Sequence, residues 1–96
     1  MTTSQEIRTY LEKINPEALY IGQEEEHDSA LIGVAYIQRE NEFVHVAMYE
    51  YEELIISFAK QFEDEEDPEE SAMEWVDYNI TGGYLGTRTP LIISME

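Results

Sequence analysis

The acidic residues are the most numerous chemically functional side chains of this sequence, and their carboxylates are densest in a single run. Nine of the fifteen residues at positions 63–77 are acidic. Duplex DNA carries a negative charge about every 1.7 Å along its axis, and carboxylates spread over a small domain can approach that density. The run therefore predicts a surface that competes for a DNA-binding groove, although a solvated acidic surface without that role stays open. Its members are Glu63, Asp64, Glu65, Glu66, Asp67, Glu69, Glu70, Glu74 and Asp77.

A second acidic cluster lies in the polar segment 22–29, which has no hydrophobic periodicity and is predicted to be an exposed loop. We expect this cluster to help the longer run in contacting a basic partner. Within it, His27 lies between two acidic residues, so a raised pKa is expected, because negative charge favours the protonated ring. The acidic members are Glu24, Glu25, Glu26 and Asp28.

Neither cluster fits a dedicated metal site. A calcium loop of the EF-hand type alternates oxygen ligands around a central glycine, whereas "EDEEDPEESAMEW" has no glycine and a misplaced proline. The chain has no cysteine, which excludes thiolate metal sites and cysteine nucleophiles. His27 and His45 have no serine partner in a recognisable nucleophile motif. The sequence therefore predicts a protein that is not an enzyme and holds no metal or cofactor.

The glycine-rich segment "GGYLGTRTP", residues 82–90, could be taken for a phosphate cradle, but its context is wrong. A Walker loop needs GxxxxGK[ST] between a strand and a helix. This segment has no lysine, follows a predicted helix and precedes a strand, so no helix N-terminus is available to hold phosphate. We expect Gly82 and Gly83 to end the helix in a left-handed conformation and Gly86 to allow a turn. Arg88 is expected to pair with a nearby carboxylate.

The elements that position these groups begin with an amphipathic helix and two strands. Thr3 and Glu6 fit a capping box at the start of the helix. The runs at 30–38 and 42–49 are rich in β-branched and aromatic residues and are separated by a hairpin-length gap, which predicts an antiparallel pair. His45 in the second run is expected at a sheet face as a packed, hydrogen-bonded side chain. The apolar face of the helix is predicted to hold Ile7, Tyr10, Leu11 and Ile14.

Two more helices and a last strand complete the order. One apolar stripe predicts a helix over about 50–63. Asp67 as N-cap and Pro68 at the first helical position mark the start of the next helix, over 68–80. "LIIS" then predicts a strand able to join the hairpin. The stripes consist of Tyr51, Leu54, Ile55, Phe58, Ala59 and Phe62 in the first helix, and of Ala72, Met73, Trp75, Val76 and Ile80 in the second.

The predicted fold class is therefore α+β, in the order α-β-β-α-α-β, with helices packed on a short antiparallel sheet. Ninety-six residues leave room for a single small domain with one hydrophobic core. Within it, about 1–21 form the N-terminal helix and turn, 22–29 the acidic loop, and 30–94 the hairpin, two helices and final strand.

The net charge of the chain predicts which class of partner it binds. Twenty-two acidic and five basic residues give a formal net charge of −17. Nucleic acid and anionic membranes are disfavoured as direct partners, because both attract positive charge. No signal-peptide pattern or membrane-spanning run is present, so a cytoplasmic protein is expected. The expected partner is a basic protein, and a homodimer is also possible. Solubility or adaptation to salt is the alternative use of the charge.

Two stretches, "YEYEELIISF" and "SAMEWVDYNITGGYLGTRTPLII", resemble small proteins encoded by many tailed bacteriophages. The members of that family are mostly of unassigned function, so the resemblance implies a phage origin and not an activity. Gly83 departs from the family pattern, which has a small residue with a side chain there, and the run at 63–70 is more acidic than the pattern requires. The matching residues are Tyr49, Tyr51, Leu54, Ile55, Glu74, Trp75, Asp77, Tyr78, Asn79, Gly82, Tyr84, Leu85, Gly86, Thr89 and Pro90.

The phage resemblance and the acidic runs together suggest a function. Phages encode compact inhibitors of host restriction and CRISPR machinery, and several of these inhibitors are DNA mimics. The leading hypothesis is a non-enzymatic inhibitor that occupies a basic nucleic-acid-binding site on a host defence protein. The alternative is a phage accessory or regulatory module that binds its partner through Trp75, Tyr78 and Tyr84, with the acidity serving solubility alone.

Overall fold

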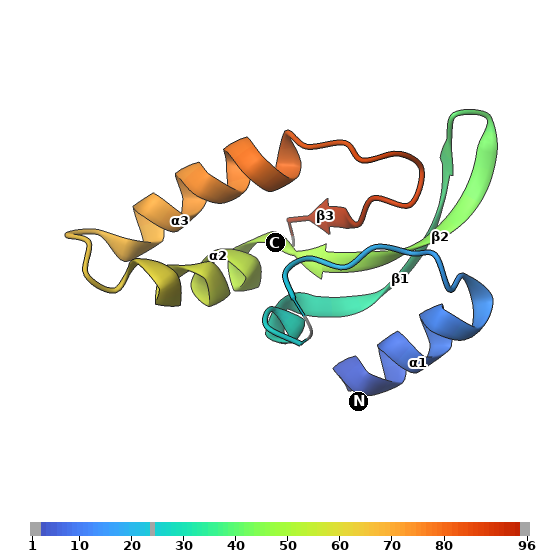
Figure 1. Ribbon diagram of the computed structural model, residues 1–96, viewed down its shortest axis with the longest axis horizontal. Coiled ribbons are helices and arrows are strands. Elements are labelled where there is room, and N and C mark those ends of the chain that lie inside the picture. Colours follow the sequence, from blue (N-terminus) through green and yellow to red (C-terminus); the bar gives the residue numbers. More distant parts are fainter. Residues whose placement is uncertain (1–2, 24, 95–96) are drawn as a thin grey trace.

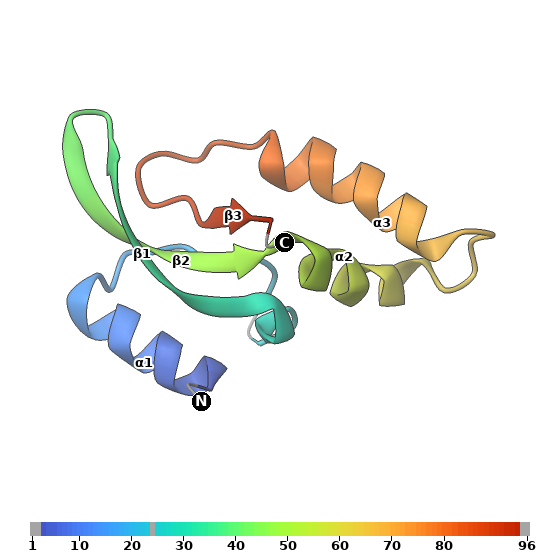
Figure 2. The ribbon, with the colours of Figure 1, turned by 180° about the vertical axis from the view of Figure 1, so that it is seen from behind.

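A long antiparallel hairpin, β1 (Leu31–Arg39) and β2 (Glu42–Glu50), organises the computed structural model, which describes residues 3–23 and 25–94 (Figures 1 and 2). The two turn residues, Glu40 and Asn41, have φ values of 50° and 70°. Positive φ at both central positions is the geometry that joins two strands with the least splaying. The predicted antiparallel pair is therefore confirmed.

The last strand, β3 (Leu91–Ile93), lies beside β2, so the sheet order is β1-β2-β3. Its pairing with β2 is parallel, and the prediction of a purely antiparallel sheet is wrong at this strand. A parallel neighbour requires a long crossover connection. Here the two helices after β2 carry the chain away from the sheet, and residues 82–90 bring it back to enter β3 in the direction of β2 (Figure 1).

The first helix, α1 (Ser4–Ile14), lies alongside the hairpin (Figure 1). The Glu6 backbone N–H donates to the Thr3 hydroxyl across 3.2 Å, which confirms the predicted N-cap. Ile7 and Leu11 are buried, as the stripe predicts. The prediction is wrong for the other two members of the apolar face, because Tyr10 and Ile14 are 54% and 37% exposed.

The second helix, α2 (Tyr51–Ala59), continues directly from β2 and ends in a 3₁₀ turn, η2 (Lys60–Phe62). The third, α3 (Pro68–Val76), begins where the sequence predicts, since the Asp67 carboxylate accepts the Glu70 N–H at 3.2 Å. The two helices run side by side, joined by the acidic turn, and extend away from the sheet (Figures 1 and 2).

A π-helical turn, η3 (Asp77–Thr81), continues α3 and ends at the C-cap Gly82, so the predicted end of the helix at the glycines is confirmed. Gly82 has φ −85°, so the left-handed ending predicted for it is wrong. A Cβ on Gly83 would lie 2.8 Å from the carbonyl oxygen of Asn79, so this glycine is required for close backbone approach. Gly86 has φ +101° and makes the predicted turn.

The hydrophobic core lies where α1, the sheet and the α2–α3 pair meet. Tyr49 and Leu54 are fully buried there, and the Tyr49 hydroxyl accepts the Ile21 N–H at 3.1 Å. Ala72 and Val76 of α3 are fully buried, as predicted, whereas Met73 and Trp75, predicted on the same face, are 43% and 40% exposed. None of the helices within residues 3–23 and 25–94 is long and apolar enough to cross a membrane.

Candidate protein-binding surface

The α2–α3 pair and its turn form the region we call the acidic end, residues 50–77. It holds twelve acidic residues and one basic residue, Lys60, and so carries 11 of the 17 net negative charges in 28 residues. The other four basic residues lie in α1, the hairpin and the glycine-rich segment. The negative charge is therefore concentrated where the helices extend from the sheet (Figure 1).

All nine predicted carboxylates of positions 63–77 are exposed. None of them forms an ion pair with any residue that the structure describes. Their charges repel one another, and the apolar stripes of α2 and α3 oppose this repulsion by holding the helices together.

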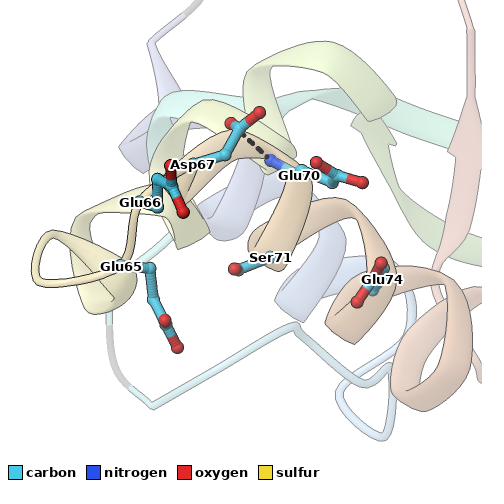
Figure 3. A pocket seen from close by; sticks show the side chains of 6 residues that line it. All are labelled: Glu65, Glu66, Asp67, Glu70, Ser71 and Glu74. Carbon is cyan, nitrogen blue, oxygen red and sulfur yellow. Dashed lines mark hydrogen bonds between the residues drawn. The ribbon is translucent and has the colours of Figure 1, made fainter.

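Five of these carboxylates surround one open hollow of about 510 Å³. Asp67 lies where α3 begins, and Glu70 and Glu74 follow one turn apart on the helix, with Ser71 at the centre (Figure 3). The turn before α3 adds two further carboxylates to the rim. The acidic residues around the hollow are Glu65, Glu66, Asp67, Glu70 and Glu74.

Two carboxylates of the run also have local structural contacts. Asp67 caps α3, and Asp77 accepts the Tyr51 hydroxyl at 2.6 Å, which links the start of α2 to the end of α3. Burial, together with this hydrogen bond, raises the pKa of Tyr51 to about 12, so the phenol stays protonated and donates throughout the physiological range. Glu69 lies apart from the hollow, on the side of α3 that faces α2.

The second predicted cluster divides into two parts. Glu25 and Glu26 are exposed, and the Gln61 amide donates to Glu26 across 3.1 Å. This bond places the segment beside η2, close in sequence to the start of the main run. Asp28, by contrast, accepts two hydrogen bonds from Arg8, each 2.7 Å long, and its side chain is only 10% exposed. Glu24 lies outside the described residues.

The burial of His27 differs most clearly from what the sequence predicts. The segment 22–29 was predicted to be an exposed loop with a raised histidine pKa, yet His27 is only 2% exposed. Its ring stacks on Phe58 at 3.8 Å, and its Nδ1 lies 2.7 Å from the Ser57 hydroxyl. Burial lowers the pKa of His27, and this effect exceeds the attraction of Glu26 and Asp28 for its charged form.

Ser57, His27 and Glu26 together have the residue types of a hydrolytic triad, which the sequence analysis did not identify. Glu26 lies 3.5 Å from His27 Nε2, while the serine is at Nδ1, the reverse of the usual arrangement. Ser57 is also only 5% exposed, so its hydroxyl lies beneath the surface. The arrangement docks the 22–30 segment onto α2. Thirty residues separate His27 from Ser57, and no local signal relates them.

The glycine-rich segment is fixed to the rest of the chain by its neighbours. Arg88 pairs with Glu17 at 2.6 Å, which confirms the prediction that it pairs with a carboxylate. Arg39 donates to the carbonyl oxygen of Thr87 at 3.2 Å, and Tyr84 donates to Glu40 at 2.7 Å. The segment therefore braces the turn of the hairpin, as a structural connection.

A second kind of surface lies on the hairpin, which the sequence analysis did not identify. Tyr36 and Phe43 are 61% and 60% exposed, and their rings stack at 5.3 Å. His45 packs against Tyr36 at 4.3 Å, which agrees with its predicted place at a sheet face. Alternation along β1 and β2 was a usable signal for this cluster, because residues two apart share a face.

Residues 3–23 and 25–94 contain no group of three His, Cys, Asp or Glu side chains placed to hold a metal ion. Chemically, the acidic end offers many separate hydrogen-bond acceptors, each carrying charge, in place of one convergent site. Such a surface attracts basic groups over a wide area.

Comparison with known proteins adds no relative. No protein-family model matches the chain, and neither a curated protein nor a solved structure matches it. The proposals below therefore rest on the residues and their geometry, and the phage origin rests on the resemblance of the two stretches quoted above.

Proposed function

We propose that this chain is a phage-encoded, non-enzymatic inhibitor that acts in the host cytoplasm. Its acidic end would occupy a basic nucleic-acid-binding site on a host defence protein and so exclude DNA or RNA from that site. The observation that carries this proposal is the set of nine exposed carboxylates at 63–77, none of which forms an ion pair with a described residue.

The charge density supports the comparison with nucleic acid. A helix as long as α3, nine residues, spans about 13 Å, and duplex DNA of that length carries about eight negative charges. The turn before α3, α3 itself and the first residue of η3 together present nine carboxylates over a somewhat longer stretch. Lys60 is the only basic residue of the acidic end, so little positive charge interrupts this field.

Binding through such a surface has two measurable properties. Long-range attraction speeds the encounter with a basic groove, and the affinity falls as salt screens the charges. A nucleic acid that binds the same groove competes, because both ligands use the same positive residues. An interface formed mainly by apolar side chains would show neither property to the same degree.

The test is retention of a host protein from infected-cell lysate on the immobilised chain, followed by competition. A nucleic-acid-binding protein retained at about 50 mM salt is expected to dissociate at about 200 mM salt and on addition of duplex DNA or RNA. Glu65→Gln, Glu66→Gln and Glu70→Gln together are expected to weaken the purified pair at least about tenfold.

A matched variant controls for net charge. Glu6→Gln, Glu12→Gln and Glu42→Gln also remove three negative charges from exposed positions, but outside the acidic end. This variant is expected to bind within about threefold of the wild type. Equal binding by both triple variants, or a retained protein that nucleic acid does not displace, would rule out the proposed mimicry.

The alternative function, a phage accessory or regulatory module with an aromatic interface, draws support from a different observation. Tyr78 is 84% exposed, and Tyr84 is 55% exposed although it is hydrogen-bonded to Glu40. Trp75 is partly covered by Phe58, at 4.9 Å between the rings. A partner bound through these residues would be retained at high salt and lost on Tyr78→Ser, so the same retention experiment separates the two functions.

A further inference from the structure

The acidic end also contains an apolar groove, which lies between α2 and α3 and encloses about 280 Å³. Ile55, only 6% exposed, is part of its lining, and Ile56 and Met73 remain 48% and 43% exposed beside it. The hydrogen bond between Tyr51 and Asp77 joins the two helices at one end of the pair. Exposed apolar side chains on so charged a surface are unexpected if the surface serves solubility alone.

Carboxylates accompany this apolar strip on both helices. Glu52 of α2 and Glu69 of α3 line the groove, and Glu70, the next residue after Glu69, belongs to the acidic hollow. The groove and the hollow therefore lie on different sides of α3 and share no lining residue. A ligand that fits the groove must present apolar side chains flanked by positive charge.

We propose that the α2–α3 groove binds a basic amphipathic helix of the partner protein. The inference rests on the proposed function and adds the partner's chemistry to it: leucine-like residues on one face of the helix contact Ile56 and Met73, and flanking lysine or arginine residues meet Glu52 and Glu69. A helix fits because two neighbouring helices of nine residues each present a furrow about 13 Å long. Apolar side chains at i, i+4 and i+7 of a bound helix cover a similar length.

Pure nucleic-acid mimicry does not require this groove. DNA presents a charged backbone without apolar side chains on its outer edge, and a surface that only imitated it would gain nothing from an exposed isoleucine and methionine. The groove therefore predicts that affinity depends on an apolar contact as well as on charge. This contact distinguishes one basic partner from another, which charge alone does poorly.

The experiment uses two synthetic peptides, each about 14 residues long, or roughly 21 Å as a helix. Both contain the same leucines and lysines. In one, the leucines fall on one helical face, and in the other they are scrambled so that no face is apolar. The full-length protein is expected to bind the amphipathic peptide about tenfold more tightly than the scrambled one, since the two half-exposed side chains become buried.

Two variants locate the contact. Ile56→Ser with Met73→Ser is expected to bring the amphipathic peptide to the affinity of the scrambled one, and to leave the scrambled peptide unchanged. Tyr36→Ser with Phe43→Ser removes similarly exposed apolar side chains from the hairpin and is expected to keep the tenfold preference. In unmodified protein labelled at its methionine methyl groups, the Met73 resonance should shift on adding the amphipathic peptide, whereas Met48, packed against the sheet, should not.

The outcomes separate the groove from the acidic surface. If the wild type binds both peptides equally, or prefers the amphipathic one without a shift at Met73, the groove inference is wrong and the proposed function stands. If neither peptide binds at low salt, the acidic end does not attract basic chains, and both proposals are overturned. Loss of the preference in the hairpin variant places the apolar contact on β1 and β2, which also overturns the groove inference.

Discussion

The acidic end and the hairpin expose their side chains in opposite ways. At the acidic end, the exposed residues are mainly unpaired carboxylates, and a narrow strip of apolar side chains lies between them. On the hairpin, Tyr36 and Phe43 are exposed but stacked, and the cations nearby bond to other parts of the chain, Arg39 to Thr87 and Arg88 to Glu17. Arg39 of the hairpin thus bonds within the chain, whereas the acidic end leaves its exposed carboxylates without an ion pair to a described residue.

This difference implies that the two regions contribute differently to the stability of the fold. The charges at 63–77 repel one another and oppose folding, so the core beneath α2 and α3 must supply the stability that the surface removes. The hairpin needs less support, because its strands are hydrogen-bonded along their length. Four predictions test this difference in stability between the two regions, beginning with the largest expected effect.

Leu54→Ala should destabilise the protein most. Leu54 is fully buried where α2 meets the rest of the core, and its truncation is expected to cost about 2–5 kcal/mol of unfolding free energy. Phe43→Ala on the hairpin, where the ring is 60% exposed, should cost about 1 kcal/mol through loss of its stacking on Tyr36. Urea unfolding followed by circular dichroism measures both. Equal losses would show that the hairpin carries as much of the stability as the α2 junction.

His27 should make stability depend on pH. Burial lowers its pKa in the folded state, so below its ordinary value of about 6.5 the unfolded chain binds the extra proton. The contribution of the neutral ring is therefore fully present above about pH 6.5 and is lost as pH falls, by at most about 1.4 kcal/mol per unit.

The His27→Gln variant isolates this effect from the many carboxylates. Glu26, Asp28 and Lys60, the charged groups that act on His27, are the same in both proteins. The difference in unfolding free energy between wild type and variant should therefore shrink between about pH 7.5 and pH 5.5. A difference that stays constant over this range would mean that His27 titrates alike in the folded and unfolded chain.

The two helix caps should respond differently to truncation. Thr3→Ala removes the cap of α1 and is expected to cost about 1 kcal/mol. Asp67→Ala removes the cap of α3 but also a charge from the acidic end, so its cost should be smaller. Asp67→Asn, which keeps an acceptor, should be at least as stable as the wild type. Thermal unfolding at low salt ranks the three variants, and a larger loss for Asp67→Ala than for Thr3→Ala would contradict the repulsion argument.

Salt should stabilise the wild type by screening the acidic end, and this effect should be the smallest of the four. Glu65→Gln, Glu66→Gln and Glu70→Gln together should reduce the gain in melting temperature between low and high salt. Glu6→Gln, Glu12→Gln and Glu42→Gln change the net charge equally, but should reduce the gain less, since those residues lie outside the acidic end. Equal reductions would mean that only total charge matters for stability.

Several parts of the fold could be predicted because their signals are local. The Asp67 cap with Pro68 after it marks the start of α3, and the apolar stripe of α2 agrees with the burial of Leu54, Ile55 and Phe58. The hairpin follows from two strand-forming runs and a short gap. The cap and the stripe relate residues a few positions apart, and the pairing of the hairpin follows from the short turn between its strands, so the sequence alone contains these relations.

The predictions that proved wrong concern contacts between residues far apart in the chain, or a backbone position that more than one conformation can satisfy. The burial of His27 depends on Ser57 and Phe58, thirty or more residues away. The predicted left-handed end of α3 at Gly82 assumed one use of glycine, whereas Gly83 serves close backbone approach instead. The exposure of Met73 and Trp75 depends on how far α2 covers α3, which periodicity does not determine.

The element order, the cap of α3 and the concentration of carboxylates at 63–77 can be read from the sequence, because composition and short-range spacing specify these features. Three other features follow only from tertiary packing: β3 runs parallel to β2, Asp28 pairs with Arg8, and an apolar groove lies between α2 and α3. Each of these depends on how the helices leave and return to the sheet. That path is set by packing between residues far apart in the chain, and no local pattern encodes it.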